Sequence, residues 1–410
     1  MTEASREPSG RRGGDLGVAL GLALGPAVGL GFARFAYALL LPAMRADLGW
    51  SFSVAGAMNT ANALGYLLGA LLAASAARLA GSRRMFLAGL AITALALGLS
   101  AFSENNIVLL ALRAVAGVAG AISFVVGAGL AAQAAGRHAP ARAALLLGVY
   151  FAGGGAGSVG SGLLIPPLLA HSSDEAGWRE GWLLLGALSV LALALSILAV
   201  RRAQEPPSTL STHDRWPRRT LMALLVAYLL FGAGYISYMT FIVALLEEEG
   251  FNPGEITSFW IVLGIAAVAA PFAWSPILSR LPGGRGPALV LAVVTAGALL
   301  PLLSATTWAA FVSAGLFGGS FLTVVTAVTD VARVNLHPSY WTPAIGTLTV
   351  AFALGQCVGP AISGALSDRS SGVFAGLALS AGILASAMLT ALAQRPRDAS
   401  QDPHTPRGTR

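Results

Sequence analysis

Residues 181–220 read GWLLLGALSVLALALSILAV and then RRAQEPPSTLSTHDRWPRRT. The first twenty of these residues carry no charge, and a helix needs about 20 apolar residues to cross the roughly 30 Å hydrocarbon core of a membrane. The next twenty hold five arginines and three prolines. An apolar run that ends so abruptly in a basic, proline-containing segment predicts a membrane-spanning helix followed by a linker at the membrane surface.

The composition of the whole chain agrees with this interpretation. Of its 410 residues, 56% are hydrophobic and 10% are charged, whereas a soluble domain carries about 25% charged residues. So little polar surface excludes a cytosolic enzyme, a secreted domain and a disordered protein. The sequence has no lysine and a single cysteine, Cys357, which excludes Schiff-base chemistry, internal disulfides and thiolate metal clusters. We expect no cofactor and no bound metal, and we attribute the net charge of +7 to membrane topology rather than to nucleic-acid binding.

Apolar runs of spanning length recur along the chain. They are unbroken, which excludes a membrane β-barrel, because its strands alternate apolar and polar residues. The predicted fold class is therefore an all-α integral membrane protein. The linker at 201–219 divides the helices into two six-helix bundles, at 16–200 and 220–393, with polar tails at 1–15 and 394–410. The twelve expected membrane helices lie at about 16–41, 53–76, 85–102, 106–134, 144–167, 181–200, 220–246, 257–278, 287–305, 308–330, 343–366 and 373–393.

The distribution of arginine predicts the orientation in the membrane. With the N-terminus inside the cell, 20 of the 25 arginines fall in cytoplasmic segments, and only Arg45, Arg179 and Arg369 fall in outer loops. Cytoplasmic loops of membrane proteins carry such an excess of basic residues. Both termini are therefore expected in the cytoplasm, which requires an even number of helices.

Three short patterns repeat at a nearly constant spacing. GFARF at 31–35 is echoed by GYISY at 234–238, DLGW at 47–50 by EEGF at 248–251, and ARLAGSR at 77–83 by SRLPGGR at 279–285, at offsets of 203, 201 and 202 residues. Two parallel six-helix halves joined by a cytoplasmic linker are typical of a transporter that works by alternating access. The alternative is a duplicated membrane scaffold or receptor that transports nothing.

The whole chain resembles the major facilitator superfamily of transporters. GFARFAYALLLPAM at 31–44, DLGW at 47–50 and NTANALGY at 59–66 are similar to its bacterial YbfB/YjiJ-type branch. This resemblance implies the major facilitator fold, a multi-pass location in the bacterial cytoplasmic (inner) membrane, transport of a small molecule and a monomeric protein.

The resemblance also indicates residues for gating or coupling. The superfamily's loop between helices two and three contains an aspartate that is thought to latch the cytoplasmic gate. Here the loop keeps its basic residues, Arg78 and, in the second half, Arg280, but has no aspartate. The implied latch is therefore weaker or built differently. Arg113 matches the superfamily's Arg-x-x-x-Gly pattern in helix four, and a glycine-rich run at 153–160 is similar to its antiporter motif without the proline.

Arg34 and Arg113 are the ionisable residues that fall well inside predicted helices, and no aspartate, glutamate or histidine does. A guanidinium at the centre of the membrane costs about 2.5–3.5 kcal/mol, so each needs a polar cavity or a partner. Their positive field attracts a carboxylate or phosphate through paired hydrogen bonds. We predict a small organic anion as substrate, with Arg34 as its main contact. The alternatives are that Arg34 caps backbone carbonyls or extends to the membrane surface, and that Arg113 serves packing.

Other polar side chains could line the same cavity. They either share a helical face near Arg34 or occupy the equivalent surface of the second half. Each could instead form an interhelical hydrogen bond, worth about 0.6 kcal/mol on average. The remaining predicted binding residues are Tyr37, Asn59, Asn62, Tyr66, Tyr235, Tyr238 and Gln356.

Proton coupling normally requires a carboxylate or histidine inside the membrane. The nearest is Asp330, at the cytoplasmic end of helix ten, where it can also pair with Arg333. Coupling through Asp330, co-transport of a protonated substrate and facilitated exchange all remain open, so protons are a candidate partner beside the substrate and the lipid bilayer.

The predicted function is secondary active or facilitated transport of a small solute. The alternative is a proton-driven exporter of drugs or hydrophobic compounds.

An enzyme is not expected. The sequence has no HExxH motif, no Gly-x-Ser-x-Gly motif and no acidic cluster.

Overall fold

The computed structural model describes residues 9–136, 138, 140–172, 176–204, 217–337, 340–370 and 372–395. Over these ranges the chain is helical and contains no strand, so the predicted all-α class is confirmed. Within the described ranges, eleven segments are long and apolar enough to cross a membrane. Both outer parts of the tails and most of the central linker lie outside the described residues.

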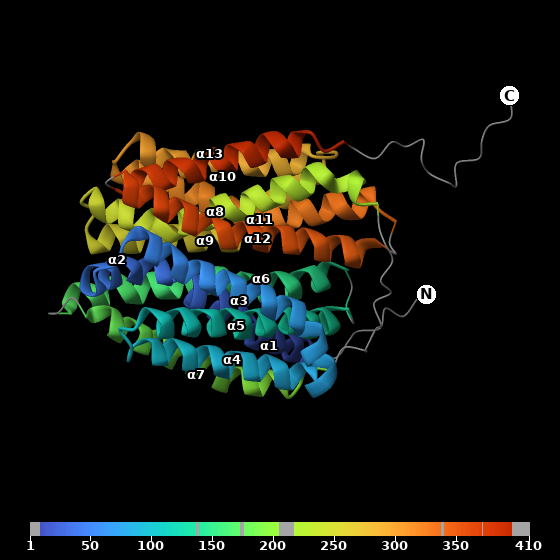
Figure 1. Cartoon of the computed structure of the whole chain (residues 1–410). Coiled ribbons are helices and arrows are strands. Elements are labelled where there is room, and N and C mark those ends of the chain that lie inside the picture. The colour runs from blue at the N-terminus through green and yellow to red at the C-terminus, as the bar shows by residue number, and fades with distance from the viewer. Residues whose placement is uncertain are drawn as a thin grey trace, which may run out of the picture.

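The twelve expected crossings correspond to two groups of helices. In Figure 1 the first group, through α7, lies on one side, and the second group, from α8 onward, lies on the other. The first crossing is built from three consecutive pieces, a helix, a π-helix and a second helix. The first group comprises α1 (Ser9–Pro26), η1 (Ala27–Phe35), α2 (Tyr37–Leu48), α3 (Phe52–Ala80), α4 (Ser82–Ser100), α5 (Asn106–Ala135), α6 (Pro140–His171) and α7 (Gly177–Val200). The second comprises η2 (Arg218–Leu221), α8 (Met222–Glu248), α9 (Pro253–Leu278), α10 (Arg285–Leu303), α11 (Thr307–Asn335), α12 (Trp341–Arg369) and α13 (Phe374–Leu392).

Several helices run past the predicted apolar spans. The first crossing continues to Leu48 rather than ending near residue 41, and α11 continues to Asn335 rather than ending near residue 330. Hydropathy marks only the part of a helix that lies in hydrocarbon, whereas the helix itself continues into the polar surface layer. The extra turns carry polar and charged residues, which is why composition alone places them in loops.

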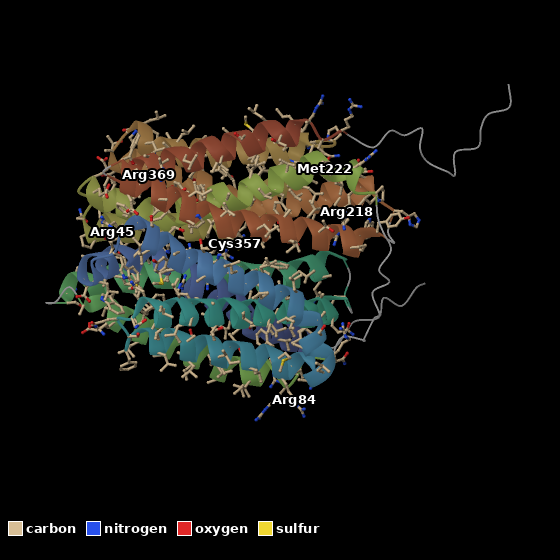
Figure 2. All side chains as sticks on the ribbon, in the orientation of Figure 1. Arg45, Arg84, Arg218, Met222, Cys357 and Arg369 are labelled. Atoms are coloured by element: carbon tan, nitrogen blue, oxygen red, sulfur yellow. The ribbon has the colours of Figure 1, made fainter. Side chains whose placement is uncertain are left out.

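The helices connect at two ends of the molecule. We call the end where α7 stops and α8 begins the linker end, and the opposite end, which carries the α2–α3 and α8–α9 turns, the turn end. Figure 2 places Arg45 and Arg369 at the turn end and Arg84 and Arg218 at the linker end. The arginine count therefore predicts that the linker end faces the cytoplasm.

The internal repeat is visible in the backbone of the turns. Gly49 after α2 and Gly250 after α8 have φ of 63° and 82°, and Gly81 after α3 and Gly283 after α9 have φ of 86° and 61°. Such left-handed backbone favours glycine. A glycine with positive φ thus recurs in both halves at the turns that repeat in the sequence, although the connection from α9 to α10 is longer than that from α3 to α4.

The π-helix η1 interrupts the first crossing and contains Arg34. It follows Pro26, which has no backbone N–H to donate, and it ends where the N–H of Ala36 donates to the carbonyl of Gly31 at 2.9 Å. Gly31 permits close packing, because a Cβ there would lie 2.5 Å from the Cα of Gly157 on α6. π-Helical segments occur frequently at functional sites, and this nine-residue one carries Arg34 on its last turn.

Candidate functional site

Arg34 lies at the junction of the two bundles. It is on the last turn of η1, and its side chain is 3% exposed. One Nη2 hydrogen bond goes to the Oε1 atom of Gln356 on α12, and the Nε2 atom of Gln356 donates to the hydroxyl of Tyr235 on α8 at 3.0 Å. Three helices from both bundles therefore meet at one buried guanidinium. Figure 2 shows Cys357, the sequence neighbour of Gln356, midway along the bundles.

The charge of Arg34 is not neutralised by any residue that the structure describes. Its partner Gln356 is a neutral amide, and no carboxylate forms an ion pair with it. The Nε–H of Arg34 is buried and donates to none of the described atoms. The guanidinium lies over the ring of Tyr66, 5.2 Å from its centroid, where the ring's negative face favours a cation. This arrangement leaves donor capacity and positive charge available.

Arg113 has two acceptors in its own bundle, and its buried Nε, like that of Arg34, has no partner among the described atoms. Its guanidinium donates through Nη1 to the carbonyl of Ala33, and its Nη2 lies 3.5 Å from the Oδ1 atom of Asn59. It also lies over the ring of Tyr37, 4.6 Å from the centroid. Because Ala33 immediately precedes Arg34, Arg113 braces the backbone that presents Arg34. It is 3% exposed.

The predicted residues of α3 divide into two kinds. Asn59 crosses between the bundles, because its Nδ2 donates to the Oγ1 atom of Thr240 on α8 at 2.5 Å. Tyr66 lies beneath Arg34. Asn62 instead donates to the backbone carbonyl of Arg113 at 3.1 Å, within the first bundle. Of these three, Asn59 and Tyr66 are placed where they can respond to a ligand at Arg34.

Tyr37 and Tyr238 contact their own bundles. The hydroxyl of Tyr37 donates to the carbonyl of Ala55 at 2.8 Å. The hydroxyl of Tyr238 lies 2.6 Å from the hydroxyl of Ser313, which donates to the carbonyl of Gly297 at 2.6 Å. The structure therefore brings Arg34, Tyr66, Asn59, Tyr235 and Gln356 together at the junction and turns Tyr37, Asn62 and Tyr238 toward helix packing.

Sequence reasoning missed an aromatic group beside Tyr235. The Tyr235 ring stacks on Phe231, Phe352 and Phe321, with centroids 5.0, 5.5 and 5.9 Å apart. Phe35, directly after Arg34, meets Phe321 edge to face at 5.8 Å and so joins this stack to the first bundle. Phe231 and Phe352 each lie four residues before a predicted site residue, on the same helical face, and that spacing could have identified them.

Of the predicted gating or coupling residues, Arg113 adjoins Arg34, whereas Arg78, Arg280 and Asp330 lie away from it, toward the linker end. Arg78 donates to the hydroxyl of Ser75 at 2.9 Å, and Arg280 is exposed in the turn after α9. Asp330 is exposed on α11 and forms no ion pair with Arg333. The guanidinium of Arg333 instead lies over the Trp341 ring, 5.7 Å from its centroid. The expected Asp330–Arg333 pair is therefore replaced by a cation–π contact.

Comparison with known proteins identifies the family. Residues 26–392 match the family described as uncharacterised MFS-type transporter YbfB. The chain belongs to this family of the major facilitator superfamily. It is also 27% identical, over 314 residues, to monocarboxylate transporter 11 of Mus musculus, and the match covers 71% of this chain and 67% of that protein.

Two solved structures share the fold. The crystal structure of the nucleoside transporter NupG superposes with a TM-score of 0.69 at 13% identity, covering 92% of this chain and 98% of that chain. A bacterial homologue of the human lysosomal transporter Spinster, inward-facing and unoccupied, has a TM-score of 0.68 at 16% identity and covers 96% of this chain and 100% of that chain. The fold is thus the major facilitator fold, and the protein is a multi-pass membrane transporter of small solutes.

Proposed function

We propose that this transporter carries a small organic anion across the bacterial cytoplasmic membrane by alternating access, with Arg34 as the main contact of the anionic group. The observation that carries the proposal is the state of the Arg34 guanidinium, which is 3% exposed and contacts only a neutral amide as its side-chain acceptor. An arginine stays charged at any physiological pH. A buried guanidinium without a carboxylate is therefore a site for an anion supplied from outside the chain.

Gln356 serves as the partner that a substrate displaces. A carboxylate is a stronger acceptor than an amide, because hydrogen bonds between charged groups are roughly twice as strong as neutral ones. The Nη2 atom of Arg34 is held by Gln356, and its Nε has no partner among the described atoms. These two donors lie on one edge of the guanidinium, and that edge can bind both oxygens of a carboxylate.

The same contact links substrate binding to the arrangement of the bundles. Arg34 belongs to the first bundle, and Gln356 and Tyr235 belong to the second. A substrate that replaces Gln356 at Arg34 changes contacts on both sides of the junction at once. Transporters of this architecture bind substrate at the interface of their repeats.

The relatives support the anionic substrate class to different degrees. The name of the mouse relative, monocarboxylate transporter 11, states a carboxylate as its substrate class, and we extend that class to this chain. The likeness to the nucleoside transporter is at 13% identity and supports the fold.

The arginine count supports an orientation with the linker end and both termini in the cytoplasm.

The test is uptake into proteoliposomes of labelled acetate, benzoate and succinate, with tetraphenylphosphonium as a cationic compound, with and without a pH gradient. We expect saturable uptake of at least one anion by the wild-type protein. Arg34→Ala and Arg34→Lys should both reduce it by about tenfold or more, because lysine cannot form the paired hydrogen bonds. Arg84→Ala, an exposed arginine at the linker end, is the matched control and should retain uptake.

Uptake of the cation but of none of the anions, unchanged in Arg34→Ala, contradicts the proposal. That result would favour an exporter of hydrophobic cations, for which the aromatic group around Tyr235 offers suitable contacts. Dependence of anion uptake on the pH gradient would identify protons as the coupling ion.

A further inference from the structure

A carboxylate of the second bundle caps a helix of the first. Asp368 lies at the turn end of α12, one residue before the helix ends. Its Oδ1 atom accepts from the backbone N–H of Phe52 at 2.7 Å, and its Oδ2 accepts from the N–H of Ser53 at 2.9 Å and from the Ser53 hydroxyl at 2.5 Å. Phe52 and Ser53 are the first two residues of α3. We call these three hydrogen bonds the inter-bundle cap.

The inter-bundle cap satisfies donors that α3 does not satisfy by itself. The first N–H groups of a helix have no partner within the helix. The side chain of Ser51, the N-cap residue, accepts from the N–H of Val54 at 3.3 Å and also hydrogen-bonds the Asp368 carboxylate. The N–H groups of Phe52 and Ser53 are left to Asp368. The negative charge of Asp368 also lies at the positive end of the α3 dipole, where an anion is stabilising.

The repeat-related helix of the second bundle is capped in a different way. At the start of α9, the Asn252 side chain accepts from the N–H of Glu255, and the Glu255 carboxylate accepts from the N–H of Asn252, both at 3.0 Å. Both partners belong to α9 and its N-cap. In α3 the position equivalent to Glu255 is Val54, which has no carboxylate. The capping box of α9 thus stays within the second bundle, whereas the first two N–H groups of α3 take their acceptor from the other bundle.

The inter-bundle cap lies along a close contact between α3 and α12. A Cβ on Gly364 of α12 would lie 2.3 Å from the carbonyl oxygen of Phe52, and a Cβ on Gly56 of α3 would lie 2.3 Å from the carbonyl oxygen of Pro360. One turn deeper, the Thr60 hydroxyl donates to the carbonyl of Cys357 at 2.8 Å. The two helices are therefore in backbone contact from the site at Gln356 outward to the turn end.

We propose that Asp368 holds the turn end of the transporter closed, so that the three hydrogen bonds to Phe52 and Ser53 must break before the bundles separate at this end. This proposal rests on the alternating-access part of the proposed function and is independent of the anionic substrate. Opening exchanges the hydrogen bonds between these two N–H groups and the exposed Asp368 carboxylate for hydrogen bonds to water, and it moves the negative charge away from the positive end of the α3 dipole. Removing the carboxylate therefore favours the state that is open at the turn end.

The native cysteine provides the measurement. Cys357 is the only cysteine in the chain, is 7% exposed and lies on the α3–α12 contact. A membrane-impermeant maleimide reaches it only when the bundles separate. The rate of labelling is measured in intact cells and in inverted vesicles, with the reagent on one side of the membrane in each. Because Cys357 precedes Asp368 by three helical turns, its thiol reports the opening without touching the cap.

Asp368→Asn is the main variant, because it keeps the size of the side chain and removes the charge and one acceptor oxygen. We expect it to raise the labelling rate about tenfold, from the side that the turn end faces. Ser53→Ala removes only the hydroxyl donor and should raise the rate less. In the Asp368→Asn background, Ser53→Ala should raise the labelling rate less than it does in the wild type, because the Ser53 hydroxyl has already lost its charged acceptor.

Glu248→Gln is the matched control. Its carboxylate also accepts from a backbone N–H near the turn end, that of Val373 at 3.4 Å, but donor and acceptor both belong to the second bundle. It should label at the wild-type rate. Monodisperse elution in detergent establishes that each variant is folded, and Ser53→Ala provides the test if Asp368→Asn fails to fold.

The outcomes separate this proposal from the anionic substrate. Labelling of Asp368→Asn at the wild-type rate from both sides overturns the role of Asp368, even where anion uptake is found. A raised rate in Asp368→Asn and in Glu248→Gln alike also overturns it, because the effect is then not specific to a contact between bundles. A raised rate in Asp368→Asn alone supports it, including where no anion is transported.

Discussion

The guanidinium of Arg34 donates to the side-chain oxygen of Gln356, which lies 322 residues further along the chain and in the other bundle. This single hydrogen bond joins the residue that we propose as the anion contact to the helix that carries the inter-bundle cap. Asp368 lies on that same helix, toward the turn end. A substrate that displaces Gln356 therefore acts on α12, and α12 closes the turn end.

Replacement of Gln356 by glutamate tests this relationship directly. Gln356→Glu places a carboxylate of nearly the same shape beside Arg34 and supplies an internal competitor for the substrate anion. We expect the KM for anion uptake to rise about tenfold or more, because the substrate must now displace a charge-assisted hydrogen bond. Initial rates of uptake over a range of substrate concentrations measure the effect. Gln356→Asn, which shortens the amide without charge, should raise KM less; an equal rise in both variants would assign Gln356 a packing role.

The sequence predicts much of this fold because hydropathy and charge act locally. Each apolar run specifies a membrane helix by itself, and the turns repeat because the same glycines with positive φ recur in both halves. Membership of the major facilitator superfamily and an all-α fold are thereby predictable. The orientation, the domain boundaries and the roles of the site residues stay predictions.

The contacts of the site are not predictable in the same way. One contact joins Arg34 to Gln356 across 322 residues of sequence, and another joins Ser53 to Asp368 across 315 residues. Both contacts form only when the two bundles come together. The π-helix that contains Arg34 follows Pro26 and packs tightly against α6, and a helical periodicity does not reveal it. Arg333 could pair with Asp330 by spacing, but Trp341, which begins the next helix, provides a competing surface.

Arg113 and Arg34 should respond differently to substitution. Arg113→Ala removes the hydrogen-bond donor to the Ala33 carbonyl and the cation over the Tyr37 ring. Each buried polar group that is left unpaired lowers the free energy of unfolding by about 1–3 kcal/mol. We expect a lower melting temperature in detergent and a lower yield of folded protein. Arg34→Ala should lower the melting temperature less, because the acceptor that it leaves is the side-chain amide of Gln356, which can turn to another donor, rather than a fixed backbone carbonyl. Differential scanning fluorimetry of the two variants side by side makes the comparison. An equal fall in both melting temperatures would give Arg34 a structural role instead.

Tyr235→Phe isolates the hydroxyl that accepts from Gln356. The ring stack with Phe231 and Phe352 remains, so the change removes one hydrogen bond worth about 0.5–1.5 kcal/mol. We expect a change in KM of a fewfold with little change in melting temperature. Tyr238→Phe is the control, because its hydroxyl contacts Ser313 within the second bundle. It should alter stability by a similar amount and leave KM unchanged.

Gly364→Ala tests the closeness of α3 and α12 without touching any charge. A Cβ at residue 364 would lie 2.3 Å from the carbonyl oxygen of Phe52, so the helices must move apart at the turn end. We expect faster labelling of Cys357 by the impermeant maleimide, a lower rate of uptake and a destabilisation of about 1–3 kcal/mol. Gly382→Ala in α13 has open space around the new methyl group and should be neutral or slightly stabilising, because alanine is the better helix former. Faster labelling in Gly364→Ala that matches Asp368→Asn would show that the backbone contact and the inter-bundle cap close the same gate. An unchanged labelling rate in a folded Gly364→Ala protein would place the gate elsewhere.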